Sequence, residues 1–357
     1  MKILIDIGHP AHVHIFKNVA WNLSQKGYEI IFTTRDKENE LYLLKKYNFQ
    51  YISFGKNKKT KLGKLFGLIY FNFRLLIVAI KFKPDLYLSH GSMYAAQVAW
   101  LLRKDHISLE DSGNTEQIKL YAPFTKAIIT PDFLPNDLGE KQIRYKSNHE
   151  LSYLHPKYFK PNKDIYQFLG VSEKEPYAIL RFVSWFATHD SGQKGLCLKE
   201  KEALVNNLIS KGLKVFISSE RHQLPENLKD YSIKIPPEKI HDALANATIY
   251  IGEGATMASE SGVLGTPSIY ISTITRYYNI DQEKFGLVFN FLNFNGVIEK
   301  VNEILEIQNR KHIFKQRQQK FLDEKIDLTT FLIWFIENWP KSFKTLKKDP
   351  DYQYKFK

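Results

Sequence analysis

The sequence predicts an α/β protein with two domains, each built around a parallel sheet. Three observations support this prediction. The 357 residues are too many for one hydrophobic core of ordinary size and suit two. Short apolar runs, typical of buried strands, alternate with segments of helical periodicity in both halves of the chain. Between the halves, residues 131–176 form an irregular stretch punctuated by five prolines.

The first half opens with a strand–helix–strand pattern. Residues 2–7 form an apolar strand, residues 13–26 carry apolar side chains at helical spacing, and Gly27 ends the helix before a strand at 28–33. Such a unit builds parallel sheets. The other elements expected in this half are strands at 51–54, 86–89, 106–109 and 126–130, and helices at 38–47 and 91–102.

The second half repeats this alternation. Its expected strands are residues 177–182, 214–218, 232–235, 248–251, 268–271 and 287–289. Its expected helices are residues 198–211, 239–246, a segment after Gly254, 295–307, 314–322 and 328–338. We therefore expect one domain at residues 1–160, a second at 161–330, and a C-terminal helix with a basic tail at 331–357.

Composition narrows the class of protein. Hydrophobic residues make up 43% and charged residues 25%, as in ordinary globular proteins. A single cysteine, Cys197, excludes an internal disulfide and fits the reducing cytoplasm. Residues 1–6 include an acid and read as a first strand rather than a signal peptide. The net charge is +13, but no nucleic-acid-binding motif accompanies it, so no nucleic-acid partner is expected.

Basic residues concentrate in residues 56–83 and again in 341–357. In the first stretch lysines are mixed with Leu, Phe, Tyr and Ile. The longest uncharged run there, residues 65–73, is about nine residues long, against roughly 20 needed to span a bilayer. Two interpretations remain open. The segment is either an amphipathic helix on the inner, anionic face of a membrane or a core helix with a solvated lysine face.

The most informative motif follows the predicted strand at 248–251. It begins Gly252-Glu253-Gly254-Ala255-Thr256 and opens a helix that contains Glu260. Free N–H groups at a helix start, together with the helix dipole, favour phosphate. A carboxylate one to two turns further on can accept hydrogen bonds from two ribose hydroxyls. Tight packing without any ligand is the alternative explanation of these glycines.

The spacing Gly254-x5-Glu260-x4-Gly265-x-Pro267 resembles the donor-site signature of GT-B glycosyltransferases, above all the peptidoglycan N-acetylglucosaminyltransferase. It is similar also to the matching segment of hydrolysing UDP-N-acetylglucosamine 2-epimerases. The resemblance implies a GT-B-like fold, with two Rossmann-like domains facing each other across a cleft. It also implies that Gly254, Ala255 and Thr256 hold a diphosphate and that Glu260 holds the ribose, with Gly252 and Glu253 as further candidates for donor binding.

Histidines follow the first predicted strand in Gly8-His9-Pro10-Ala11-His12. A loop at this position of a doubly wound sheet borders the ligand site, and histidine titrates near neutral pH. We therefore expect His12, and next His9, as a general base. No carboxylate or cysteine joins them locally, so no metal is expected. With Phe16-Lys17 and residues 149–156, this opening resembles an uncharacterised bacterial and archaeal family known as domain of unknown function 354.

The epimerase pattern is matched only in part. Its first acid is replaced by Ser92, whereas Glu110 and Glu116 occupy plausible positions for its two glutamates, with Asp111 beside the first. His189 could match its histidine. The alternative for the three acids is a loop that caps the following helix.

Two arginines complete the candidate donor site. Arg181, at the end of a predicted strand, could pair with phosphate oxygens or form a salt bridge between the domains. Arg276 follows another strand and could meet the sugar or the diphosphate.

These features predict a metal-independent glycosyltransferase without a cofactor. It would use a nucleotide-sugar donor, with UDP favoured, and build a surface polysaccharide or glycolipid on a lipid-linked or saccharide acceptor. The first alternative is a UDP-N-acetylglucosamine 2-epimerase or hydrolase. The second is a non-catalytic basic module that binds a membrane surface or nucleic acid.

Overall fold

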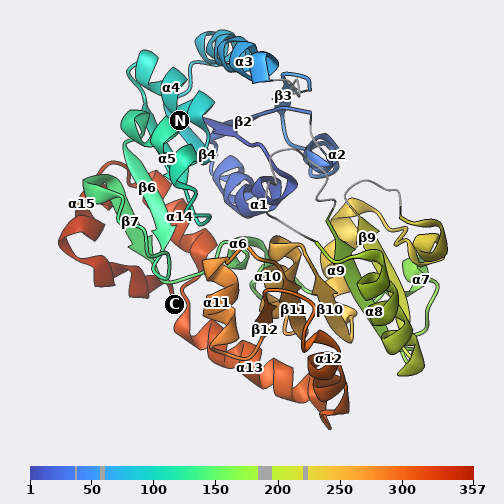
Figure 1. The fold of residues 1–357 in the computed structure, drawn as a ribbon. Helices are drawn as coiled ribbons and strands as arrows, with labels where there is room; N and C mark the ends of the chain where they lie inside the picture. Colours follow the sequence, from blue (N-terminus) through green and yellow to red (C-terminus); the bar gives the residue numbers. More distant parts are fainter. Residues whose placement is uncertain (37, 57–60, 184–194, 220–223) are drawn as a thin grey trace. The chain divides into compact units, whose positions relative to one another are not determined.

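A computed structural model describes residues 1–36, 38–56, 61–183, 195–219 and 224–357 of the chain. The chain divides into two compact units. Unit 1 comprises Met1–Tyr158 and Lys325–Lys357, and unit 2 comprises Phe159–Glu324. Both units contain a fully parallel sheet, as the sequence predicts (Figure 1).

Unit 1 contains a seven-stranded sheet with strand order β3-β2-β1-β4-β5-β6-β7. The strands are β1 (Lys2–Asp6), β2 (Glu29–Thr34), β3 (Tyr51–Ser53), β4 (Leu86–His90), β5 (Asp105–Leu109), β6 (Ala127–Pro131) and β7 (Gln142–Tyr145). The order reverses between β1 and β4. In such sheets ligands bind beyond the carboxyl ends of the strands at the point of reversal.

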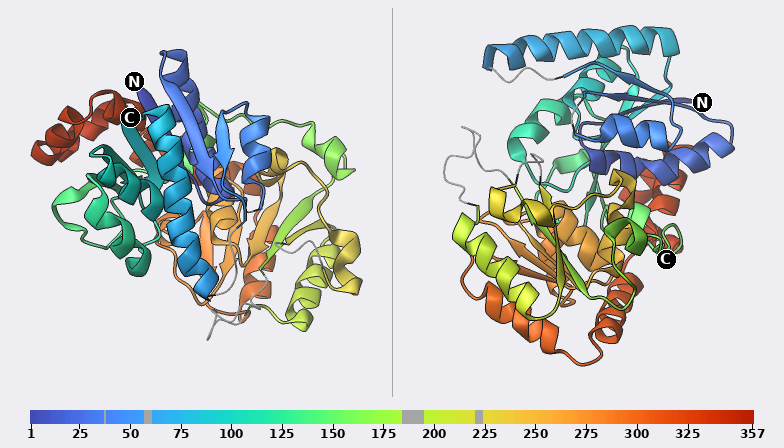
Figure 2. Two further views of the ribbon diagram at one scale, coloured as in Figure 1. Left: turned by 90° about the horizontal axis from the view of Figure 1, so that it is seen from above. Right: turned by 90° about the vertical axis from the view of Figure 1, so that its right-hand side faces the viewer.

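The helices of unit 1 pack on this sheet. They are α1 (Pro10–Gln25), α2 (Glu40–Lys46), α3 (Lys61–Phe82), α4 (Met93–Leu101), α5 (Thr115–Tyr121), α6 (Leu151–Leu154), α14 (Leu328–Glu337) and α15 (Lys341–Lys348). α3 lies against α4 (Figure 2). Both helices pack in a buried cluster with the sheet residues Leu4, Ile31 and Tyr87. α1 packs with α6 and α14.

The last 33 residues belong to unit 1, and Asp327 anchors their beginning. Its carboxylate accepts hydrogen bonds from Lys157 Nζ at 2.7 Å and from Tyr158 Oη at 2.6 and 2.8 Å, and it caps α14 through Thr330 N–H. Further along, Trp339 Nε1 donates to Asp105 at the start of β5. The C-terminal segment is therefore an integral part of the first folding unit.

Unit 2 contains a five-stranded sheet with order β12-β11-β10-β8-β9. Its strands are β8 (Tyr177–Phe182), β9 (Lys214–Ser219), β10 (Ile249–Gly252), β11 (Ser268–Ile271) and β12 (Val288–Phe291). Its helices are α7 (Ile165–Leu169), α8 (Leu198–Ser210), α9 (Ile240–Asn246), α10 (Ala255–Val263), α11 (Tyr277–Glu283), α12 (Val297–Glu306) and α13 (Arg310–Glu324). The strand order reverses between β8 and β10.

Some local predictions are wrong. Residues 232–235 form no strand; Ser232 makes only an isolated bridge to Ile217. The stretch 131–176 is more ordered than its prolines suggest, since it contains β7, α6 and α7. Among the described residues, no helix is long and apolar enough to cross a membrane.

Candidate active site

The loop after β1 brings two of the predicted histidines to the point where the order of the unit 1 strands reverses. Pro10 begins α1, and His9 caps it by accepting the Ala11 N–H on Nδ1 at 3.2 Å. The His12 ring, one turn into the helix, accepts the Gly8 N–H on Nδ1 at 3.3 Å. Both predicted catalytic histidines thus lie at the carboxyl end of β1.

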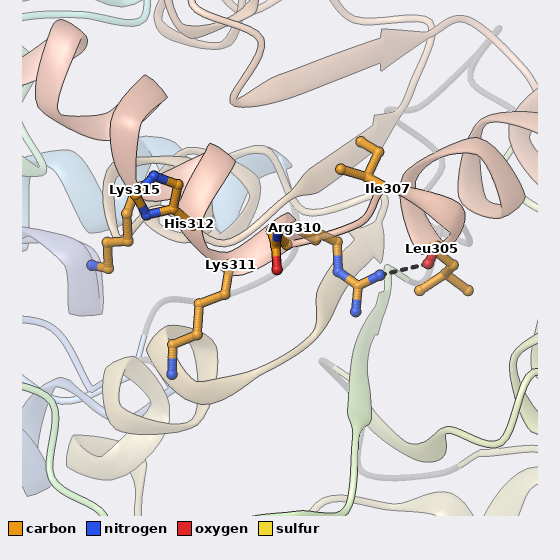
Figure 3. Close-up of a pocket in the computed structure, with 7 residues that line it drawn as sticks. Leu305, Ile307, Arg310, Lys311, His312 and Lys315 are labelled. Atoms are coloured by element: carbon orange, nitrogen blue, oxygen red, sulfur yellow. Dashed lines mark hydrogen bonds between the residues drawn. The ribbon is translucent and has the colours of Figure 1, made fainter.

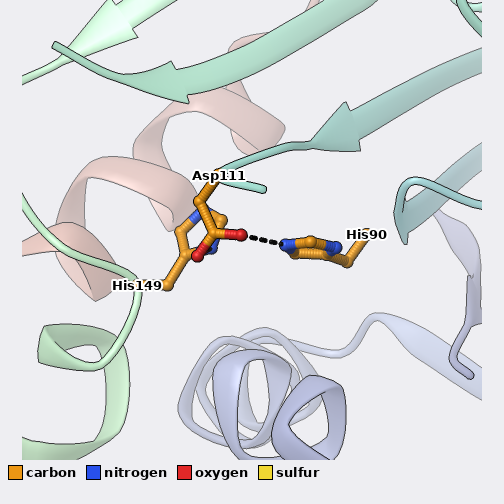
Figure 4. A group of neighbouring side chains, drawn as sticks. All are labelled: His90, Asp111 and His149. Carbon is orange, nitrogen blue, oxygen red and sulfur yellow. Dashed lines mark hydrogen bonds and ion pairs between the residues drawn. The ribbon is translucent and has the colours of Figure 1, made fainter. Parts of the chain in front are cut away.

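Beside His12 lies a group of polar residues that the sequence did not reveal. Figure 4 shows its members, His90, Asp111 and His149. The His12 ring stacks on His90, at the end of β4, with centroids 4.5 Å apart and planes inclined by 24°. His90 Nε2 donates to Asp111 Oδ1 at 3.1 Å, and His149 Nδ1 lies 2.9 Å from Asp111 Oδ2. Asp111, a predicted residue, is therefore held between two imidazoles.

Burial and mutual charge set the protonation of this group. Burial lowers the pKa of His12 well below its usual value, and His90 and His9 add to this effect. Burial opposes ionisation of Asp111, but His149 and His90 outweigh it and hold the Asp111 pKa well below the usual range. Burial also disfavours the His90 cation, yet Asp111 raises the His90 pKa overall.

The nitrogen and oxygen atoms of His90, Asp111 and His149 lie within 4.8 Å of one another, and their types are ones that a divalent cation could use. The 3.1 Å contact between His90 and Asp111 is a hydrogen bond, whereas His149 Nδ1 makes a 2.9 Å ion-pair contact with Asp111 that lacks hydrogen-bond geometry. We therefore describe the three residues as an imidazole–carboxylate chain.

A buried ion pair lies beside this loop. Arg35 Nη1 contacts both oxygens of Asp6, at 2.8 and 2.7 Å, and Ser92 Oγ donates to Asp6 Oδ2 at 2.5 Å. Ser92 occupies the position at which the epimerase pattern has an acid, and here it binds a carboxylate supplied by β1. A Cβ atom at Gly8 would lie 2.8 Å from Arg35 Nη2, so glycine permits this close approach.

The two predicted glutamates have different surroundings. Glu110 is buried, and its Oε1 accepts hydrogen bonds from Ser112 N, Ser112 Oγ and Gly113 N, while Oε2 accepts from Tyr121 Oη. This arrangement holds the loop that leads to α5. Glu116 is exposed in the first turn of α5. Their catalytic roles stay predictions, and the contacts of Glu110 are those of a residue that orders the loop.

In unit 2, the predicted glycine-rich turn lies where the order of strands reverses. Gly252 ends β10 opposite Arg181 of β8, and a Cβ at Gly252 would lie 2.5 Å from the Arg181 carbonyl oxygen. A Cβ at Gly254 would lie 2.9 Å from Arg181 Cγ. Gly254 caps α10 without a side-chain bond, and Ala255 and Thr256 are half-exposed in its first turn. The glycines are therefore packed closely against Arg181, while the first residues of α10 are still partly exposed.

The two acids of this motif are both buried and hydrogen-bonded. The Glu253 carboxylate accepts from Val183 N–H at 2.8 Å and from Leu196 N–H at 2.5 Å, so it joins the two chain segments. Glu260 lies inside α10, with Oε1 3.0 Å from His241 Nε2 of α9. His241 is a candidate site residue that the sequence analysis missed.

Three predicted donor residues remain, and the structure describes two of them, Arg181 and Arg276. Arg181 Nη1 donates to Ser218 Oγ at 2.8 Å. Arg276 is half-exposed at the N-cap of α11. His189 lies outside the described residues.

A family model described as "Protein of unknown function (DUF354)" matches residues 1–339. The chain belongs to the DUF354 family. The uncharacterized protein MJ0665 of Methanocaldococcus jannaschii is 27% identical over 281 residues, which cover 75% of this chain and 81% of the relative. The family membership that the opening loop suggested is thereby confirmed.

Solved structures similar to this chain include a UDP-GlcNAc 2-epimerase and a glycosyltransferase. UDP-GlcNAc 2-epimerase from Neisseria meningitidis, bound to UDP-GlcNAc, has a TM-score of 0.66 at 15% identity, over 88% of this chain and 94% of that one. The glycosyltransferase SsfS6 of Streptomyces sp. SF2575 has a TM-score of 0.60 at 13% identity, over 95% of this chain and 100% of that one. The predicted GT-B-like α/β fold is confirmed.

Two surface hollows lie away from these residues. One, of about 660 Å³, is lined by the end of α12 and the start of α13, where Arg310 donates to the Leu305 carbonyl (Figure 3). The other, of about 320 Å³, lies between α3, α4 and Phe124.

An apolar patch borders the second hollow. Ile69 and Phe73 of α3 and Trp100 and Leu101 of α4 are 58–65% exposed. Because Phe71, Leu75 and Val78 of the same α3 are buried, this helix contributes both to the core and to the surface.

Proposed function

We propose that the protein is a glycosyltransferase that takes its sugar from a nucleotide-sugar donor, with a UDP-sugar favoured. The observation that carries the proposal is the accessible start of α10 at the strand reversal of unit 2, beside Gly252 and Gly254. The first N–H groups of a helix have no partner within it and carry a partial positive charge. They would bind the diphosphate and stabilise it as it leaves, without requiring a metal ion or a cofactor.

Glu260 would bind the ribose. Its Oε1 contacts His241, which fixes the carboxylate in one orientation. In this arrangement the carboxylate could accept hydrogen bonds from ribose hydroxyls. Arg181, whose backbone lies against Gly252, and Arg276 are further candidates for contact with the diphosphate.

Unit 1 holds a second group of candidate residues. His12, His90 and Asp111 meet at the carboxyl ends of β1, β4 and β5, the position at which doubly wound sheets bind ligands. The apolar patch and the exposed cations Arg103 and Lys104 beyond α4 suit a lipid-linked acceptor at an anionic membrane surface.

An epimerase or hydrolase is the second candidate, favoured by the similarity in fold to UDP-GlcNAc 2-epimerases. Incubation with UDP-GlcNAc and no acceptor separates the two functions. Release of UDP together with epimerised or hydrolysed sugar would overturn the transferase proposal.

The donor site is tested by thermal shift with UDP-, GDP-, dTDP- and CMP-sugars, since a ligand that binds the native state raises its stability. We expect a shift with one nucleotide, loss of that shift in Glu260→Gln, and retention in Glu299→Gln, which changes an exposed acid of α12. No shift with any nucleotide would instead favour a non-catalytic binding module. An unchanged shift in Glu260→Gln would show that the ribose assignment is wrong.

A further inference from the structure

We propose that His12 is a neutral hydrogen-bond donor, not a base, and that its Nε2–H binds an oxygen of the uncharged sugar. The imidazole–carboxylate chain of His90, Asp111 and His149 holds the His12 ring in place. The inference rests on the proposed function, because the sugar is that of the proposed nucleotide-sugar donor.

The hydrogen bond to Gly8 determines which nitrogen of His12 carries the proton. Gly8 N–H donates to Nδ1, so Nδ1 must offer its lone pair, and the neutral ring carries hydrogen on Nε2. Within the part of the chain that the structure describes, no residue accepts a hydrogen bond from Nε2. Because the ring is only half-buried, this donor is available to a ligand.

The neighbours of His12 disfavour a second proton. His90 from β4 stacks on the ring, His9 lies 5.9 Å away from the same helix, and Arg35 acts from the end of β2. The Asp111 carboxylate favours a cation, but it is hydrogen-bonded to His90. Burial and these cationic groups together lower the His12 pKa, so the ring is neutral at pH 7.

His149 acts as a positioning residue. Its ring is 2% exposed and is stacked on Tyr145 at 6.0 Å. It lies 2.9 Å from Asp111 Oδ2, while His90 is hydrogen-bonded to Oδ1, so each carboxylate oxygen faces one imidazole. The orientation of His90, and hence the surface on which His12 stacks, depends on both contacts.

The charges around His12 favour an uncharged part of the ligand over a phosphate. Arg35 is already paired with Asp6, and Asp111 adds a carboxylate within the group. A phosphate would gain no unpaired cation here and would be repelled by Asp111, whereas a sugar hydroxyl or an acetamido carbonyl accepts a neutral N–H.

The first test compares UDP with UDP-GlcNAc in titrations of the full chain. We expect UDP-GlcNAc to bind the wild type more tightly, and His12→Ala to remove that advantage, a loss of about 3–10-fold, while UDP affinity is unchanged. His12→Gln, which keeps an N–H donor, should retain most of the advantage. The inference would be overturned if His12→Ala weakened UDP binding as much as UDP-GlcNAc binding. It would also be overturned if His12→Gln lost the advantage of UDP-GlcNAc over UDP as completely as His12→Ala.

The second test does not depend on ligand binding. Histidine ¹⁵N signals of the full chain report the tautomer directly, and His12→Gln assigns the His12 pair. We expect His12 as the neutral Nε2–H form at pH 7, and a rise of its titration midpoint in His149→Leu. A cationic or Nδ1–H ring would overturn the inference, and so would stoichiometric Zn²⁺ that shifts the His90 and His149 signals. Failure of the wild type to bind either nucleotide would overturn the proposed function instead, while the tautomer result would stand.

Discussion

His106 makes unit 1 sensitive to acid. It lies in β5 and has no exposed surface. Its ring nitrogen Nε2 lies 2.9 Å from Ser89 Oγ, and Nδ1 lies 2.9 Å from Thr125 Oγ1. Burial lowers its pKa to about 3, against 6.5 for an ordinary histidine. The fold therefore holds a neutral ring that the unfolded chain protonates readily.

The sign and size of the effect follow from this difference. As pH falls below 6.5, the unfolded state binds a proton that the folded state does not, so stability that is fully present above pH 6.5 is lost towards pH 3. The loss is about 1.4 kcal/mol per pH unit, or about 3 kcal/mol between pH 6.5 and 4.5.

Urea unfolding of wild type and His106→Gln at pH 7, 6, 5 and 4.5 measures this contribution. Tryptophan fluorescence is a suitable signal because Trp21, Trp100, Trp334 and Trp339 all lie in unit 1. The variant should lose about 1–3 kcal/mol at pH 7, because glutamine cannot reproduce both hydroxyl contacts. Below pH 6.5 the free energy of unfolding of the variant should fall less steeply than that of the wild type. The two slopes should differ by about 1.4 kcal/mol per pH unit. The contributions of other titrating groups are the same in both proteins and cancel in the comparison. If the stabilities of wild type and variant changed in parallel with pH, His106 would not be the cause of the acid sensitivity.

Three further predictions concern other features. Asp6→Ala leaves the buried Arg35 cation unpaired and should cost about 3–5 kcal/mol in urea unfolding; wild-type stability would contradict the buried ion pair. Gly252→Ala places a Cβ 2.5 Å from the Arg181 carbonyl and should cost about 1–3 kcal/mol. It should also weaken UDP binding in a titration, and unchanged UDP binding would argue against a donor site at this turn. Phe73→Asp should reduce flotation with phosphatidylglycerol vesicles, and equal flotation would remove the apolar patch from the membrane proposal.

Periodicity was enough to predict most of the architecture. Buried parallel strands appear as short apolar runs, and glycines mark the turns after them, so both sheets and the start of α10 were predictable. The strand β7 and the short helices α6 and α7 were missed because few apolar residues alternate there and prolines dominate the pattern. The predicted strand at 232–235 had apolar character, but only Ser232 forms a bridge.

The candidate site was harder to predict because its members are distant in sequence. His12, His90, Asp111 and His149 belong to different crossovers, and only the parallel arrangement of β1, β4 and β5 brings the first three together. The segment Ser89-His90-Gly91-Ser92, which follows a predicted strand, was the available signal for His90. His149 lies in a stretch interpreted as a domain boundary, so no pattern connected it with Asp111.

The anchoring of Asp327 has a consequence for the order of folding. Unit 2 is inserted into unit 1, since residues 159–324 separate its two segments. During synthesis from the N-terminus, unit 2 emerges whole before the chain has produced Asp327, Trp339 or the helices that complete unit 1. The second unit can therefore fold while the first still lacks its last segment. The larger sheet begins first in the chain, yet its unit is the last to be completed.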